Sequence, residues 1–181
     1  MRHGVCFLVG LFVGFCLVVS SLAEEKPVVR PPIAFDAVGS WFGLGEAQGP
    51  VPDGFPATVS MLLSFNEDGV LLGTDSTNFG VYQGLTGSPA HGSWAQSGLL
   101  GISGTFLWLQ YTPDGNLVSY VKVKMEAHME DFRTMSGSLY PELFPDLAVN
   151  PLASDSSGIP LGRFDFLALR IVPEATVASE N

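Results

Sequence analysis

Apolar and polar residues alternate along the middle of the chain, and the pattern is most regular in residues 102–130. Near its end, Val121, Val123, Met125, Ala127 and Met129 alternate with Lys122, Lys124, Glu126, His128 and Glu130. A period of two places the apolar side chains on one face of a β-strand and the charged ones on the other. In the middle of the stretch, Pro113 fixes φ at the start of a turn and Gly115 accepts the positive φ that a hairpin needs. The pattern therefore predicts two long antiparallel strands.

Further segments with strand-like patterns are bounded by turn residues. They are residues 39–42, 58–65, 70–76, 91–96, 132–140 and 162–172. Residues 77–90 and 141–160 are predicted to be long loops, and no amphipathic helix pattern stands out. Consecutive antiparallel strands close most simply into an up-and-down barrel, which removes exposed sheet edges. We therefore predict an all-β, eight-stranded antiparallel barrel, with a two-sheet β-sandwich as the alternative.

The first 23 residues have the three parts of a secretory signal peptide: a basic start at Arg2, an apolar run, and small residues before Ala23. A retained membrane anchor is the alternative, but the apolar run is short for a bilayer span and acidic residues follow it. We expect cleavage after Ala23 and export to the periplasm or the extracellular space. The remaining parts are then a flexible lead-in at 24–34, the barrel domain at 35–173 and a loose tail at 174–181.

Charge and cysteine content exclude several classes of function. Both cysteines, Cys6 and Cys16, lie in the predicted signal peptide, so the exported chain has no thiol for disulfides, metal binding or catalysis. Removal of Arg2 leaves seven basic side chains against 18 acidic ones, a balance that disfavours nucleic acid and anionic lipid as partners. No tight metal-ligating cluster and no phosphate-binding loop is visible, so we expect neither a metal nor another cofactor.

The first strand of the central hairpin is apolar on both faces. Phe106 and Trp108 point one way, whereas Leu107, Leu109 and Tyr111 point the other way. One face is expected to fill the lumen, and the other needs a cover. The proline-rich loop at 141–160, a second copy in a homodimer, or a bilayer could supply that cover. The charges along residues 122–130 argue against membrane insertion of the exported chain.

Two ionisable residues are candidates for chemistry at the mouth of the barrel. His91 follows a long loop and could act as a general base near neutral pH, or it could simply order the turn. Asp75 ends a strand and could form an acid–base pair with His91, or it could cap the loop as an Asx turn. We predict that Asp75, His91 and Trp94 meet beside the largest internal cavity. The predicted ligand-binding side chains are those of Tyr82, Trp94, Phe106 and Trp108.

Gly39-Ser40-Trp41 resembles the Gly-x-Trp motif of lipocalins and the wider calycin group. That resemblance implies a barrel whose floor is closed by Trp41, stacked on a basic residue of the last strand, here Arg170. The predicted topology is also similar to dirigent-like and allene-oxide-cyclase-like barrels. The segments at 74–76, 88–94 and 105–106 are similar to small secreted bacterial proteins, a similarity that implies no activity.

Two functions from different classes stay open at this stage. The first is an exported barrel that binds a small apolar molecule in its lumen, since eight strands enclose space for side chains or one small ligand. The alternative is a cofactor-free isomerase or cyclase that uses the same cavity, with His91 and Asp75 placing or moving a proton. Whether the protein is an enzyme depends on where these two side chains point.

Overall fold

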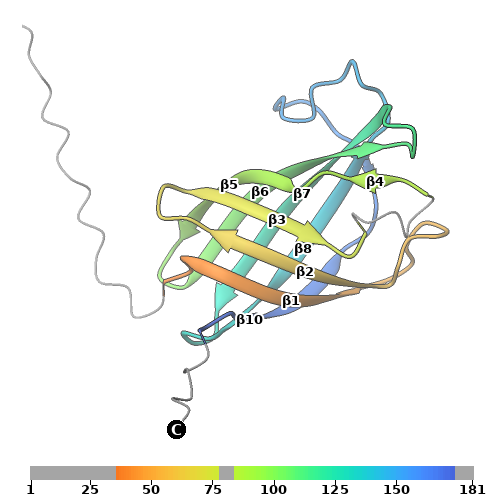
Figure 1. The fold of residues 1–181 in the computed structure, drawn as a ribbon. Coiled ribbons are helices and arrows are strands. Elements are labelled where there is room, and N and C mark those ends of the chain that lie inside the picture. The colour runs from red at the N-terminus through yellow and green to blue at the C-terminus, as the bar shows by residue number, and fades with distance from the viewer. Residues whose placement is uncertain (1–35, 78–83, 174–181) are drawn as a thin grey trace, which may run out of the picture. The chain divides into compact units, whose positions relative to one another are not determined.

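A computed structural model gives the structure of residues 36–77 and 84–173, all within the compact unit Pro32–Asn181 (Figure 1). The described elements are all strands. They are β1 (Gly39–Ala47), β2 (Thr58–Phe65), β3 (Val70–Asp75), β4 (Thr86–Gly87), β5 (Ala90–Ser97), β6 (Gly101–Tyr111), β7 (Leu117–Met129), β8 (Thr134–Phe144), β9 (Ile159–Pro160) and β10 (Phe164–Arg170). In this part of the chain no helix is long and apolar enough to cross a bilayer.

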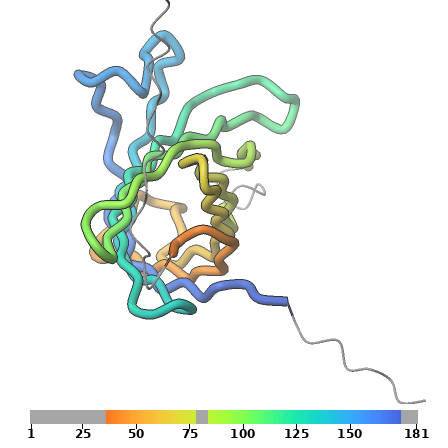
Figure 2. Tube along the Cα trace, turned by 90° about the vertical axis from the view of Figure 1, so that its left-hand side faces the viewer, coloured from red at the N-terminus to blue at the C-terminus, as the bar shows by residue number. Residues whose placement is uncertain are grey.

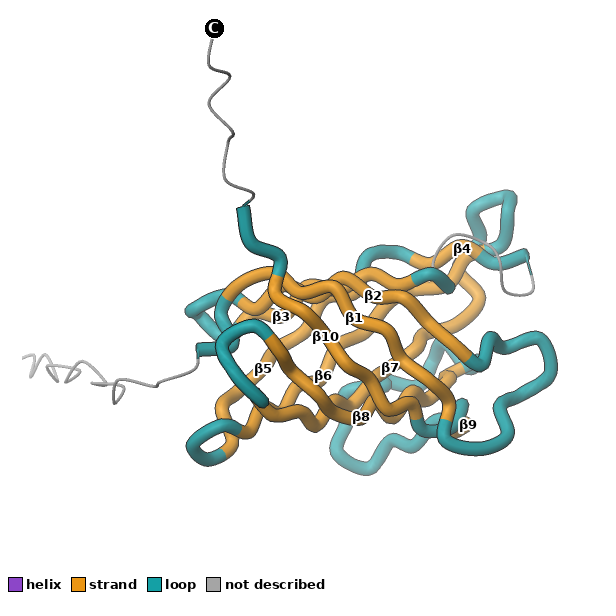
Figure 3. Tube along the Cα trace, turned by 90° about the horizontal axis from the view of Figure 1, so that it is seen from below, coloured by secondary structure: helices purple, strands orange, loops and turns teal. Residues whose placement is uncertain are grey.

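The strands form one closed antiparallel barrel. Neighbouring strands follow the order β10-β1-β2-β3-β5-β6-β7-β8, and pairing of β8 with β10 completes the circle. Seen along the barrel, the backbone curves round into a ring (Figure 2), and β1, β10 and β8 lie side by side where the barrel closes (Figure 3). The short strands β4 and β9 add to β6 and β8 outside the circle. The eight-stranded barrel predicted from the sequence is therefore confirmed, and the sandwich is excluded.

The two predicted hairpin turns form as expected. Gly69 donates its backbone N–H to the carbonyl of Asn66 at 3.1 Å, and Gly115 donates to Thr112 at 2.9 Å. Both glycines have φ of 85°, in the left-handed region that most L-residues avoid. Local turn chemistry thus sets the register of β2 with β3 and of β6 with β7.

The predicted loop at 141–160 is wrong at both ends, because β8 runs through Pro141 to Phe144 and residues 159–160 form β9. The carbonyl of Pro141 accepts a hydrogen bond from Leu161, on the side of β8 that faces away from β7. A residue's N and O point to the same side of a strand, so the missing N–H of Pro141 faces this same side. On this side β8 changes partner: it pairs with β10 as far as Leu139 and with β9 from Glu142 on. The missing N–H of Pro141 lies between the two ladders, so no ladder hydrogen bond is lost.

Inward-facing side chains fill the barrel. The buried core includes Trp41, Met61, Leu63, Phe65, Leu71, Ile102, Phe106, Trp108, Val121, Val123, Met125, Met129, Met135, Leu139, Phe164, Phe166 and Ala168. Small inward residues make room for large ones: a Cβ at Gly43 would lie 3.1 Å from Cγ of Met61 and 3.2 Å from Cβ of Ala168. The lumen is therefore a packed core along most of its length.

Candidate ligand-binding site

One end of the barrel is closed by Trp41 and Arg170, which face each other across the β1–β10 ladder. The guanidinium carbon of Arg170 lies 4.6 Å from the indole centroid, and the indole Nε1 donates to the carbonyl of Ala37 at 2.9 Å. Arg170 also donates hydrogen bonds to three backbone carbonyls, those of Asp36, Val38 and Phe132. The structure thus brings together the two residues that the calycin resemblance pairs.

Trp94 belongs to this same closed end. Its ring meets Phe65 edge-on at 5.5 Å, and its Nε1 donates to the carbonyl of Asn66 at 2.9 Å, in the turn before β3. Asp75 is the last residue of β3 and lies at the opposite end of that strand. Trp94 therefore seals the barrel beside the turn, and it does not line the cavity that Asp75 borders.

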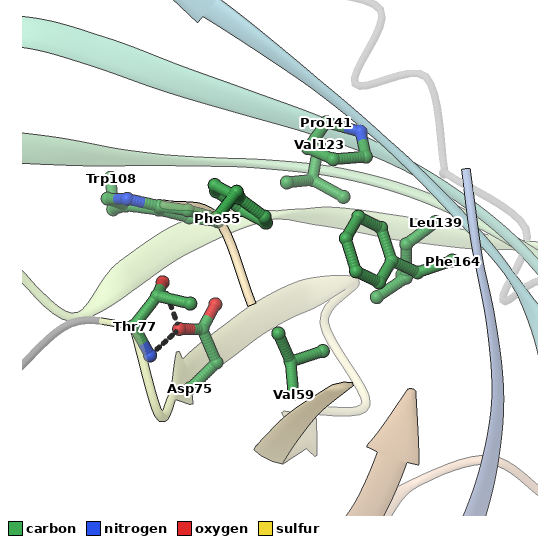
Figure 4. A pocket seen from close by; sticks show the side chains of 9 residues that line it. All are labelled: Phe55, Val59, Asp75, Thr77, Trp108, Val123, Leu139, Pro141 and Phe164. Atoms are coloured by element: carbon green, nitrogen blue, oxygen red, sulfur yellow. Dashed lines mark hydrogen bonds between the residues drawn. The ribbon is translucent and has the colours of Figure 1, made fainter. Parts of the chain in front are cut away.

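The lumen has a small cavity at the other end, drawn in Figure 4. Its lining residues are Phe55, Val59, Asp75, Thr77, Trp108, Val123, Leu139, Pro141 and Phe164. The volume is about 30 Å³, which admits a water molecule or two. Asp75 Oδ1 accepts hydrogen bonds from the Thr77 backbone N at 2.7 Å and from the Thr77 hydroxyl at 2.5 Å, the geometry of an Asx turn. Trp108 stacks on Phe106 with ring centroids 6.3 Å apart.

His91 lies on the outer wall. It is exposed, and its neighbours across the ladders are Leu72 on β3 and Leu107 on β6, which also face outward. Asp75 faces the lumen, so the wall of the barrel separates the two side chains. The predicted meeting of Asp75, His91 and Trp94 is therefore wrong, because strand β5 runs in the phase that turns Ala90 and Trp94 inward and His91 outward. Tyr82 lies outside the described residues.

A groove on the outer wall, which we call the wall groove, is much larger than the cavity in the lumen. It is lined by Ser88, Pro89, His91, Gly92, Ser93, Thr105, Phe106, Leu107, Leu109 and Leu152. Its volume of about 460 Å³ lies within the range of small-molecule sites. Three leucines give it an apolar surface, and His91 supplies an imidazole that both donates and accepts hydrogen bonds.

Close approach of β5 and β6 forms the floor of the wall groove. A Cβ at Gly92 would lie only 2.0 Å from the carbonyl oxygen of Thr105 and 2.5 Å from Cα of Phe106. No side chain fits there, so glycine is required for the strands to lie this close. The sequence pattern did not predict this close approach at Gly92, although its position between His91 and Ser93, in a strand of weak alternation, was the available signal.

The loop after β8 forms the other side of the wall groove, and Lys122 holds it in place. The ammonium of Lys122 donates to the carbonyl of Pro151 at 2.9 Å, pairs with Glu142 at 3.2 Å, and lies 4.8 Å from the ring centroid of Phe144. Lys122 is buried, with 5% of its surface exposed, although the sequence pattern had placed it on a solvated charged face. Part of the outer face of β6 and β7 is thus covered by the protein's own loop, next to Leu152.

Two neighbouring lysines lower the pKa of the Glu142 carboxyl. Burial acts to raise its pKa, but hydrogen bonds and charge from Lys124, 3.0 Å away, and from Lys122 outweigh burial and hold the pKa below its usual range. The carboxylate therefore stays ionised and forms an ion pair with Lys122 beneath the loop. The same lysine donates to the carbonyl of Pro151, the residue before Leu152.

Two further observations bear on the chemistry. Residues 36–77 and 84–173 contain no group of three or more His, Cys, Asp or Glu side chains that could hold a metal ion. His128, which shares the outer face of β7 with Lys122, pairs with Glu130 at 3.1 Å and stays half exposed.

The chain matches no protein-family model, no curated protein and no solved structure. Its function is therefore inferred from the geometry of the wall groove and of the lumen.

Proposed function

We propose that the protein is an exported barrel that binds a small apolar molecule with one polar end, and that the wall groove is the binding site. The observation that supports this proposal is the difference in cavity volume, which is about 460 Å³ in the wall groove and about 30 Å³ in the lumen. Drug-sized ligands need cavities of roughly 300–1,000 Å³. A ligand in the lumen would have to displace packed side chains such as Phe55 and Phe164.

The lining indicates the chemical class of the ligand. Leu107, Leu109 and Leu152 offer an apolar surface for a hydrocarbon or aromatic body. His91 can form a hydrogen bond with a hydroxyl or a carbonyl oxygen at one end of that body. The formal charge of −10 disfavours an anionic ligand, so a neutral alcohol or ketone fits best.

Export is part of this proposal and has its own support. The basic start, the apolar run and the small residues before Ala23 favour cleavage there. A proton-transfer activity is not proposed, because His91 and Asp75 lie on opposite faces of the wall.

Titration with the neutral fluorescent probe N-phenyl-1-naphthylamine tests the site. We expect saturable binding to the wild-type protein, at least about tenfold weaker binding to Leu107→Glu, and unchanged binding to Leu99→Glu. Leu99 is a matched control, since it is 75% exposed in the turn between β5 and β6 and outside the wall groove. Trp108→Phe tests the lumen and should bind like the wild type.

Two results would overturn the wall groove as the site. One is the absence of saturable binding to the wild-type protein. The other is normal binding by a folded Leu107→Glu variant together with weakened binding by Trp108→Phe, which would move the ligand into the lumen. Near-ultraviolet circular dichroism of each variant establishes that the barrel is intact.

A further inference from the structure

The outer face of β10, β1, β2 and β3 has a continuous apolar surface, which we call the apolar wall. It consists of Phe42, Leu44, Leu62, Leu72, Leu167 and Leu169, each between 36% and 57% exposed. Ladder pairing makes them neighbours: Phe42 is opposite both Leu62 and Leu169, and Leu44 is opposite Leu167. These four strands lie next to one another around the barrel (Figure 3). Large exposed apolar side chains on adjacent strands are uncommon on the surface of a monomer.

Charges are confined to one edge of the apolar wall. On the outward positions of β1 and β10 the charged residues are Glu46 and Asp165, which are opposite each other in the ladder. The remaining outward positions of β2 and β3 are apolar or hydroxyl-bearing. On β7, by contrast, Lys122, Lys124 and Glu126 lie on the outer face. Within the described residues, the barrel thus has one outer face that is uncharged apart from this edge, although the chain carries a strongly negative net charge.

The exposed area is sufficient for a specific interface. At about 180 Å² for a fully exposed Leu or Phe, the apolar wall offers roughly 500 Å² of side-chain surface, before its Ser and Thr neighbours are added. Two such faces bury on the order of 1,000–1,200 Å² in total, which reaches the lower range of stable protein–protein interfaces.

We propose that the apolar wall binds a second copy of this chain, in a two-fold symmetric dimer. The same patch on both copies makes a self-complementary interface, with Phe42 and Leu62 near the symmetry axis. Two molecules of the same negative charge repel each other least across an uncharged face. An antiparallel arrangement also places the Glu46–Asp165 edges of the two copies at opposite ends of the interface, where their charges stay apart.

This assignment differs from the dimer that the sequence pattern indicated. That prediction used the outer face of β6, which carries Leu107 and Leu109, and the loop beside Leu152 partly covers that face. The apolar wall lies on other strands, and its residues do not line the wall groove. The dimer therefore does not depend on the proposed ligand.

Sedimentation equilibrium of the purified protein over a range of concentrations tests the dimer. The wild-type protein should have twice the mass of one chain, with a dissociation constant in the micromolar range or tighter. Leu62→Glu should weaken association at least about 100-fold, because it buries a charge in the interface. Leu99→Glu carries the same substitution at an exposed leucine outside the apolar wall and should stay dimeric.

Several outcomes would overturn the proposal. A wild-type protein that stays monomeric up to about 100 µM would do so, and so would a dimer that both Leu62→Glu and Leu167→Glu leave intact. Leu167 is on β10 and provides a second test if Leu62→Glu fails to fold. A monomer that floats with neutral phosphatidylcholine vesicles would assign the apolar wall to a lipid surface instead.

Discussion

Replacement of Trp41 by alanine should be among the most destabilising single changes in the barrel. Trp41 has 0% of its surface exposed, and large-to-small changes of buried aromatic residues cost about 3–5 kcal/mol. The variant also loses the hydrogen bond from Nε1 to Ala37, worth about 1 kcal/mol. Loss of the stacked guanidinium of Arg170 adds about 1 kcal/mol. These contributions overlap, so we expect a total near 4–5 kcal/mol.

Trp41→Phe separates the parts of this effect. Phenylalanine keeps an aromatic ring against the core but has no N–H for Ala37, so the expected loss is about 1–2 kcal/mol. The assay is urea unfolding followed by far-ultraviolet circular dichroism, with the free energy of unfolding taken from the midpoint and slope. Leu99→Ala, at an exposed turn position, is the control and should change stability by less than about 0.5 kcal/mol.

A double-mutant cycle then isolates the stacking contact. Trp41→Leu and Arg170→Met, measured alone and together, should show a coupling energy of about 1 kcal/mol. Two results would refute the reasoning: a Trp41→Ala variant within about 1 kcal/mol of the wild type, or no coupling between the two sites. Either would mean that this end of the barrel is not held by the Trp41–Arg170 pair.

Three further predictions follow from single contacts. Glu142 has a lowered pKa in the folded protein. Its contribution to stability is therefore present above about pH 4.3, the usual glutamate value, and is lost as the pH falls through the lowered value. The free energy of unfolding, measured between about pH 5 and 3, should depend less steeply on pH in Glu142→Gln than in the wild type. Gly92→Ala should cost at least about 2 kcal/mol in urea unfolding, and more than Gly73→Ala, where the new Cβ meets the flexible end of Leu63 at 3.2 Å instead of a backbone. His91→Leu should leave the free energy of unfolding within about 0.5 kcal/mol of the wild type, and it should remove the advantage of 1-decanol over decane in displacing the naphthylamine probe.

The fold could be predicted from the sequence because its signals are local. Strict alternation in β7, and turns ending in Gly69 and Gly115, determine which residues pair and which face inward. Consecutive antiparallel strands of this kind favour closure of the sheet into a barrel. Pro141 was misleading, since its effect depends on where β8 changes partner, which is a tertiary property.

The candidate site could not be predicted from the same signals. Strand β5 is rich in small residues, so its alternation is weak and the outward phase of His91 does not show in the sequence. Leu152 lines the wall groove beside Pro151, whose carbonyl accepts a hydrogen bond from Lys122, 29 positions away in the sequence. The charged pattern of β7 predicted a solvated lysine, and burial by a distant loop overrides that pattern.

The most direct test of the wall groove is methyl NMR of the protein, with labelled leucines, titrated with N-phenyl-1-naphthylamine. Our account predicts that the methyl signals of Leu107, Leu109 and Leu152 shift in a saturable manner, while the indole N–H signal of Trp108 in the lumen stays in place. A shift of the Trp108 signal with unchanged signals from the three leucines would contradict it.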